Sequence, residues 1–294
     1  MKLIRILTAV FFCTLAHAAD NGPKWKKVLP ALPDTIALHE NVVCSKTKER
    51  DIVLNIYAPK TGGPFPGILL IHGGGWKQNQ IEADKPLAER LAAGGYVVAQ
   101  VPYRLSTEAR YPAALHDCKA ALRFMRAHAA EYKINADKIG VMGGSAGGHL
   151  SGLMGMTGGV KSLEGSGGNA DQSTALSACI VMAGGMDLIK SNEKTNGDGY
   201  VLFLGPIAEN RTLYVEASPI THVSKTSPPT LFIEGEKDSL KIGRAEMQEK
   251  LRSLGVPTEL ITLKDAPHPY WMSQPWLDET AAAALKWFDL YLKK

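Results

Sequence analysis

Residues 138–150, KIGVMGGSAGGHL, specify the architecture of this chain of 294 residues. The apolar run from Lys138 to Gly143 predicts a strand, and the small residues after Ser145 predict the start of a helix. Gly143 to Gly147 matches the pattern G-x-S-x-G, in which a serine stands on a sharp turn between a strand and a helix. Side chains at the two flanking glycines would collide in so tight a bend. The pattern therefore predicts that Ser145 is a nucleophile held above one edge of a sheet.

A second glycine-rich stretch, HGGGW at residues 72–76, directly follows the apolar run Gly67–Ile71. A continuous apolar run predicts a central strand that is buried on both faces. Attack on an ester creates an oxyanion, and glycines let backbone N–H groups approach it closely. We therefore expect an oxyanion hole made by the N–H of Gly74 or of Gly75, together with that of Ala146.

A serine nucleophile needs a base, and His268 is the best placed histidine in the chain order that follows such a turn. It lies in a loop directly after the last predicted strand, at the edge where α/β sheets bind ligands. His72 is expected to hold its own loop, and His149 is expected to pack one helical turn after the serine. His222 is expected to make local hydrogen bonds only.

The base needs a carboxylate that orients it, and Asp238 is the first candidate. It lies in the loop after the predicted strand Leu231–Glu234. Asp187, which follows another predicted strand, is the rival interpretation. Glu236 and Asp265 are interpreted as solvated charges.

Strand-like and helix-like segments alternate along the chain, which favours an α/β fold with a mostly parallel central sheet and helices on both faces. Neither a linker nor an internal repeat divides residues 19–294, so we expect a single domain. Two less regular stretches, 158–174 and 190–228, are predicted to be insertions over an edge of the sheet. The predicted strands are 50–58, 67–71, 96–101, 138–143, 176–183, 229–234 and 259–264, and the predicted helices are 83–93, 112–132, 239–254 and a last one through 277–291.

Residues 1–18 have the pattern of a secretory signal peptide. Lys2 and Arg5 precede the apolar run Ile6–Leu15, which is too short to span a bilayer, and an A-x-A site ends at Ala18. The pattern predicts export, to the periplasm or to the medium.

The composition limits which partners and cofactors are expected. The formal net charge is +4 with no dense Lys/Arg patch, so a nucleic-acid partner is not expected, and no later stretch has the length of a membrane span. Outside the signal the cysteines are Cys44, Cys118 and Cys179, and an odd count predicts at least one free thiol or an intermolecular bond. Cysteine and histidine spacing typical of a metal site is missing, and the predicted chemistry needs neither a metal nor an organic cofactor.

Aromatic residues flank the candidate site, and two interpretations of them remain open. Trp76, Tyr270 and Trp271 either stack on a sugar or a feruloyl ring or anchor the core. The glycines between Gly158 and Gly168 are expected in a loop over the same sheet edge as the nucleophile.

Several segments together resemble a known family. They are HGGGW (72–76), PYRLS (102–106), YPAALHDCKAALRFMRAHA (111–129), GGSAGGHL (143–150), GSGGN (165–169) and ASPITHVSKTSPPTLFIEGEKD (217–238). The chain resembles the α/β-hydrolase esterases from about Val42 to Leu292, and more closely their bifunctional acetylxylan and feruloyl esterase branch. The resemblance implies a triad of Ser145, Asp238 and His268, in secreted enzymes that remove acyl groups from plant polysaccharides.

Alternative functions and departures from the family remain. Carboxylesterases of the hormone-sensitive-lipase type carry similar motifs, a small amide or peptide hydrolase would use the same triad, and an inactive binding module is a third class. Glu234 stands where such enzymes often have a histidine. The polar segment Lys190–Tyr200 argues against a well-formed apolar lid, and hence against long-chain lipids.

Overall fold

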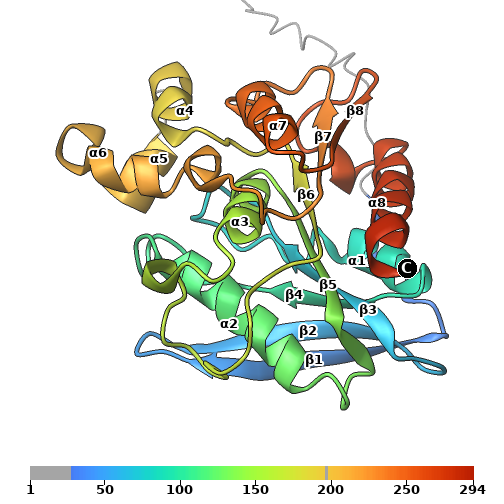
Figure 1. Cartoon of the computed structure of the whole chain (residues 1–294). Helices are drawn as coiled ribbons and strands as arrows, with labels where there is room; N and C mark the ends of the chain where they lie inside the picture. The colour runs from blue at the N-terminus through green and yellow to red at the C-terminus, as the bar shows by residue number, and fades with distance from the viewer. Residues whose placement is uncertain (1–27, 196–197) are drawn as a thin grey trace, which may run out of the picture.

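An eight-stranded sheet forms the centre of the molecule in the computed structural model, which describes residues 28–195 and 198–294 (Figure 1). The strand order is β1-β2-β4-β3-β5-β6-β7-β8. Strand β2 is antiparallel to both of its neighbours, and every other pair is parallel, which confirms the predicted α/β-hydrolase type of sheet. The strands are β1 (Ile36–Lys46), β2 (Asp51–Pro59), β3 (Phe65–Ile71), β4 (Val97–Val101), β5 (Ile134–Gly144), β6 (Ala178–Met182), β7 (Thr230–Gly235) and β8 (Thr258–Leu263).

Helices cover both faces of the sheet (Figure 1). Helices α1 (Lys85–Ala93) and α8 (Trp276–Leu292) bury their apolar sides against one face. Helices α2 (Ala113–Ala127), α3 (Ala146–Met156) and α7 (Arg244–Ser253) cover the other face. Three shorter helices extend from one end of the sheet as a cap: α4 (Leu188–Thr195), α5 (Asp198–Leu204) and α6 (Ile207–Glu216). Short 3-10 turns are η1 (Lys161–Leu163), η2 (Pro219–His222) and η3 (Tyr270–Met272).

Helix α2 shows how the sequence pattern produces the packing. Leu115, Cys118, Leu122 and Met125 recur at helical spacing, and each is fully buried against the sheet. The prediction extended this helix to residue 132, which is too far. The helix ends at Ala127, because the chain turns there to enter β5.

Two elements differ from the expectation for identifiable reasons. Strand β1 is not among the predicted strands, because its register with β2 shifts twice, between His39 and Val42 and between Val43 and Ser45, and its sequence lacks a clear alternation. Helix α7 begins at Arg244 rather than at residue 239, since the chain before it forms a loop that ends at a left-handed glycine.

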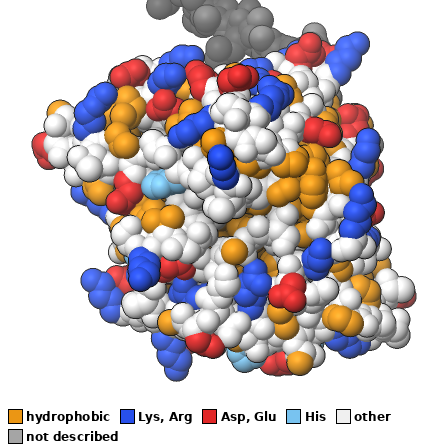
Figure 2. All heavy atoms as spheres, in the orientation of Figure 1, with side chains coloured by type: hydrophobic (Ala, Val, Ile, Leu, Met, Phe, Trp, Pro, Cys, Tyr) orange, Lys and Arg blue, Asp and Glu red, His pale blue; other side chains and the backbone are white. Residues whose placement is uncertain are grey.

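The cysteines, the surface charges and the chain ends can be compared with the predictions. Cys44, Cys118 and Cys179 are free and buried, so the free-thiol alternative is confirmed. Figure 2 shows cationic and anionic side chains interspersed over the face drawn. Within the described ranges, no helix has the length and apolarity needed to cross a membrane. The predicted signal peptide at residues 1–18 lies outside the described residues.

Candidate active site

The turn at Ser145 has the strained geometry that its sequence predicts. Ser145 has φ 58° and ψ −121°, between the end of β5 and the start of α3. Its N–H donates to the Met182 carbonyl at 2.9 Å, which ties the turn to β6. A Cβ at Gly147 would lie 2.0 Å from the Ile71 carbonyl oxygen, and one at Gly143 would lie 2.4 Å from the same atom. Only glycine therefore fits at Gly143 and Gly147, two residues before and two residues after the serine.

His268 and Asp238 meet at the same end of the sheet. They lie in the loops that follow β8 and β7, and His268 Nδ1 is 2.8 Å from Asp238 Oδ2. The other carboxylate oxygen of Asp238 accepts the Leu240 N–H at 2.8 Å. Asp238 is buried while the His268 side chain is 30% exposed, so the carboxylate is fixed and the imidazole faces the surface. This arrangement is suited to holding one histidine tautomer.

Trp271 connects His268 to the serine turn. Its ring meets the His268 ring edge-on, with centroids 5.3 Å apart. The same indole packs on the backbone of Gly144, where an added Cβ would lie 2.2 Å from Trp271 Cζ2. Its Nε1–H donates to the buried carboxylate of Asp84 at 3.1 Å. Because Gly144 has no side chain, the Trp271 ring packs on the backbone directly before Ser145 and contacts His268.

The HGGGW stretch forms a tight loop beside the serine. Gly74 has φ 102°, its carbonyl accepts the N–H groups of Lys77 and Gln78, and a Cβ there would lie 2.1 Å from the Gln78 carbonyl oxygen. A Cβ at Gly73 would lie 3.3 Å from Ser145 Cβ, so the loop touches the nucleophile's own residue. Within the part of the chain that the structure describes, the N–H of Gly75 donates no hydrogen bond.

A pocket of about 260 Å³ opens beside Ser145. Gly75 and Ala146 line it, whereas Gly74 does not, which favours Gly75 among the two alternatives for the first oxyanion donor. The other lining residues are Trp76, Lys77, His149, Ala183, Gly185, Gly199, Tyr200 and Leu240. Helix α5 thus supplies part of the wall.

The cap corrects one expectation. The polar segment Lys190–Tyr200 argues against an apolar cover, but its last residue, Tyr200, lines the pocket, and Phe203 follows in α5 and packs against Trp76. Phe203 stacks on Trp76 with centroids 4.6 Å apart, and Tyr200 lies 5.3 Å from Trp76. The sequence did not indicate this wall, because only a few apolar residues of α5 form it.

Of the three aromatic candidates for substrate binding, only Trp76 reaches the pocket. Tyr270 is fully buried and donates its hydroxyl to the Ile233 carbonyl at 2.6 Å. Trp271 is 1% exposed. A sugar cannot stack on rings that are covered on both faces, so the platform interpretation is wrong for Tyr270 and Trp271, and both anchor the core.

The other histidines considered as the base, His72, His149 and His222, are held by backbone carbonyls. His72 Nδ1 lies 2.7 Å from the Gly73 carbonyl oxygen and His149 Nε2 lies 2.7 Å from that of Ala217. Burial lowers the pKa of each to about 4, so both stay neutral at pH 7. His222 Nε2 lies 2.6 Å from the Glu216 carbonyl oxygen, as expected for a local role.

The rival carboxylates have structural partners. Asp187 accepts the N–H groups of residues 189 and 190 at the start of α4. Asp265 is paired with Lys237 at 2.7 Å, and Glu236 accepts the Asp265 N–H. Glu234, at the position that departs from the family, is paired with Arg244 at 3.2 Å.

The glycine loop at residues 158–168 was expected over the same sheet edge as the nucleophile, and among the described residues it does not line the pocket beside Ser145. An added Cβ at Gly165 would meet the His116 ring at 2.6 Å, and one at Gly167 would meet Ser45 Oγ at 2.9 Å. The loop therefore packs on α2 and on the end of β1. Arg123 holds it there by donating to the carbonyls of Glu164, Gly167 and Gly168.

Comparison with known proteins gives a consistent result. The family model BD-FAE matches residues 54–246. A probable carboxylic ester hydrolase, LipM of Mycobacterium tuberculosis, is 32% identical over 184 residues, which are 60% of this chain and 42% of LipM. The matched region spans less than half of the first curated relatives, 42 to 45% of their length.

Two solved structures are similar over most of the chain. A truncated carbohydrate esterase from gut microbiota superposes with TM-score 0.76 at 25% identity, over 89% of this chain and 99% of the other. A bifunctional GH43-CE protein of Bacteroides eggerthii gives TM-score 0.77 at 28% identity, over 88% of this chain and 38% of the other.

Proposed function

The chain belongs to the BD-FAE family, and we propose that it is a serine carboxylic-ester hydrolase whose triad is Ser145, His268 and Asp238. The observation that carries the proposal is the 2.8 Å contact between His268 and Asp238, at the sheet edge where the strained turn exposes Ser145. Asp238 fixes the tautomer in which His268 Nε2 is free to accept the serine proton.

The proposed reaction is acyl transfer in two steps. His268 removes the proton of Ser145 while the hydroxyl attacks the ester carbonyl, and the alcohol leaves with that proton. Water then attacks the acyl-serine, and His268 again accepts and returns the proton. The N–H groups of Gly75 and Ala146, both of which line the pocket, stabilise the oxyanion of each tetrahedral intermediate.

We further propose that the substrate is an acetyl or feruloyl ester of a plant cell-wall polysaccharide and that the protein is exported. The carbohydrate esterase named among the similar structures supports this substrate class. The pocket of about 260 Å³, with Trp76 in its wall, is suited to a short or a single-ring acyl group. A general short-acyl carboxylesterase is the alternative.

One comparison tests both levels of the proposal. Acetate and ferulate release would be measured from acetylated xylan, feruloylated arabinoxylan, acetylated pectin and 4-nitrophenyl acetate. Ser145→Ala should abolish every activity, whereas Ser151→Ala, on the same helix α3 but buried, should leave them. Hydrolysis of the aryl ester alone would overturn the polysaccharide proposal and leave the esterase; activity retained in Ser145→Ala would overturn the triad.

A further inference from the structure

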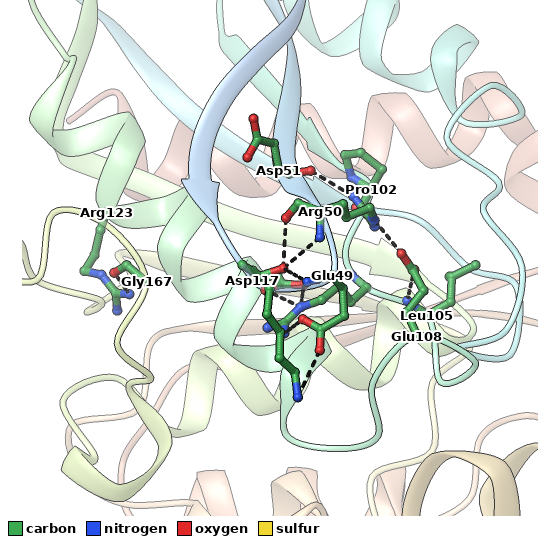
Figure 3. Close-up of polar contacts among 12 residues, drawn as sticks. Glu49, Arg50, Asp51, Pro102, Leu105, Glu108, Asp117, Arg123 and Gly167 are labelled. Atoms are coloured by element: carbon green, nitrogen blue, oxygen red, sulfur yellow. Dashed lines mark hydrogen bonds and ion pairs between the residues drawn. The ribbon is translucent and has the colours of Figure 1, made fainter.

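A polar cluster lies beside the segment Pro102–Glu108, which leads from β4 toward α2 (Figure 3). Arg104 is its centre. The guanidinium donates from Nε and Nη2 to both oxygens of Asp117, at 2.8–3.2 Å, and from Nη1 to Glu49 at 2.8 Å. The backbone N–H of Arg104 donates to Asp117 as well, at 2.8 Å. One buried carboxylate on α2 therefore fixes both the side chain and the backbone of this residue.

A second ion pair holds the rest of the segment. Arg50, which directly precedes β2, donates to Glu108 at 2.6 Å and to the Pro102 carbonyl at 2.7 Å (Figure 3). Glu108 in turn accepts the Leu105 N–H at 2.7 Å. Both ends of the segment are thus tied to charged groups, although it has no regular secondary structure until it reaches α2.

The same segment touches the oxyanion loop at two points. Tyr103 stacks on His72 with centroids 4.3 Å apart and an interplanar angle of 7°, and its hydroxyl donates to the His72 carbonyl at 3.2 Å. Ser106 donates its N–H to the Trp76 carbonyl at 2.7 Å. These contacts bracket the loop, because His72 and Trp76 are its first and last residues.

We propose that Arg104 and Asp117 are positioning residues, which set the oxyanion loop by fixing the Tyr103–Ser106 segment that holds both of its ends. The proposal rests on the proposed function, since it assigns the loop to oxyanion binding. An N–H donor stabilises an oxyanion only when it is aligned with the position that the oxygen takes in the transition state. Bidentate geometry suits this purpose because it fixes orientation as well as distance.

The ion pair is not expected to act mainly through stability. Replacing a buried ion pair by apolar residues of similar size is often neutral for folding, whereas removing one partner leaves an unpaired buried charge. The informative variant is therefore the double change Arg104→Met with Asp117→Leu. It removes the charges of Arg104 and Asp117 and the hydrogen bond on the Arg104 N–H together, and it leaves Glu49 with Lys48 at 3.5 Å.

Helix α2 offers a matched control. Lys119 is fully buried and lies 2.8 Å from Glu164, so it forms a second ion pair two residues after Asp117. That pair holds the loop at residues 158–168, which does not border the pocket. The double change Lys119→Met with Glu164→Met should alter thermal stability but not turnover.

The test measures kcat and KM for 4-nitrophenyl acetate, together with inhibition by an aryl boronic acid, which forms a tetrahedral adduct on the serine. Loss of a whole oxyanion donor lowers kcat by about 10²–10³, so a misaligned donor should lower it by about tenfold to a hundredfold. KM should stay within about twofold, and boronate affinity should fall in parallel with kcat/KM. The single change Arg104→Lys, which keeps a cation beside Asp117, should have a kcat between those of the double variant and the unchanged protein.

Two results would overturn the proposal. One is an unchanged kcat in the folded Arg104→Met/Asp117→Leu protein; the other is an equal loss in the Lys119/Glu164 control. If the double variant does not fold, Tyr103→Phe replaces it, because this change removes only the hydroxyl that reaches His72, and unchanged kcat there would also overturn the proposal. Failure of the triad itself would appear separately, as activity that survives Ser145→Ala.

Discussion

The glycines around Ser145 and the glycines at residues 158–168 have different neighbours. At Gly147 an added Cβ would lie 2.0 and 2.6 Å from the carbonyl oxygens of Ile71 and His72, which belong to the sheet and its following loop. At Gly168 the nearest atom would be the Cys44 carbonyl oxygen at 3.1 Å, and at Gly159 nothing lies within 4 Å. Both regions are rich in glycine, but an added Cβ would overlap backbone atoms only in the first, whereas at Gly165 and Gly167 it would overlap the side chains of His116 and Ser45. A glycine cluster therefore locates a reactive site only when its surroundings are known.

The largest effect is expected for Gly147→Ala. The new methyl group would overlap backbone atoms of β3 and of the oxyanion loop, which cannot move without disturbing the sheet. We expect a loss of about 3 kcal/mol in the free energy of unfolding and no measurable esterase activity. Urea unfolding and 4-nitrophenyl acetate hydrolysis would measure both. A stable, active Gly147→Ala protein would show that the turn has more room than its geometry indicates.

Asp238→Asn should leave the fold intact and lower kcat by about 10⁴, because an amide holds His268 in the wrong tautomer. Glu236→Gln, two residues away and exposed, is the matched control and should keep kcat within about twofold. Steady-state kinetics at pH 7 would separate the two. Equal effects of both changes would remove Asp238 from the triad.

The region around Ser145 should also be sensitive to acid. Burial lowers the pKa of His72 and His149 from 6.5 to about 4. Between these pH values the unfolded chain binds protons that the folded chain does not, so stability that is full above pH 6.5 is lost as the pH falls toward 4. The loss amounts to roughly 3 kcal/mol for each histidine.

Urea unfolding at a series of pH values would test whether the buried histidines cause this loss of stability. His149→Gln should flatten the pH dependence of the free energy of unfolding between pH 6.5 and 4, whatever its effect on stability at pH 7. An identical slope in both proteins would show that His149 does not contribute.

The smallest effect is expected for Gly168→Ala, in the loop that does not border the pocket. The methyl group needs only a shift of a few tenths of an ångström beside Cys44, so we expect a change below about 1 kcal/mol in stability and unchanged kcat/KM. Thermal denaturation and the aryl acetate assay would measure these quantities. A tenfold loss of activity would show that a change in this loop alters the active-site pocket.

The sequence predicted those features that depend on local backbone requirements. The strand–Ser145–helix turn, the order of the strands after β1 and the helical stripe of α2 follow from spacing and from glycine placement. The same reasoning led from the loops after β7 and β8 to Asp238 and His268, which the structure brings within 2.8 Å of each other.

Features that depend on distant contacts were not predictable in this way. The burial of Tyr270 and Trp271 is determined by partners at Ile233 and Asp84, far away in sequence. The apolar wall from α5 depends on how the cap folds onto Trp76. The sequence gives no clear signal for Arg104, which follows the end of β4 at Val101 after Pro102 and Tyr103, because its role depends on a buried partner on α2.

Covalent labelling would show whether Ser145 is the nucleophile. The protein would be treated with a fluorophosphonate, which forms a stable adduct with an activated serine, and digested for peptide mass spectrometry. We expect one adduct, on Ser145, with loss of activity in proportion to labelling and no adduct in His268→Ala. Complete inactivation with the adduct on another residue, or an active enzyme fully labelled at Ser145, would contradict it.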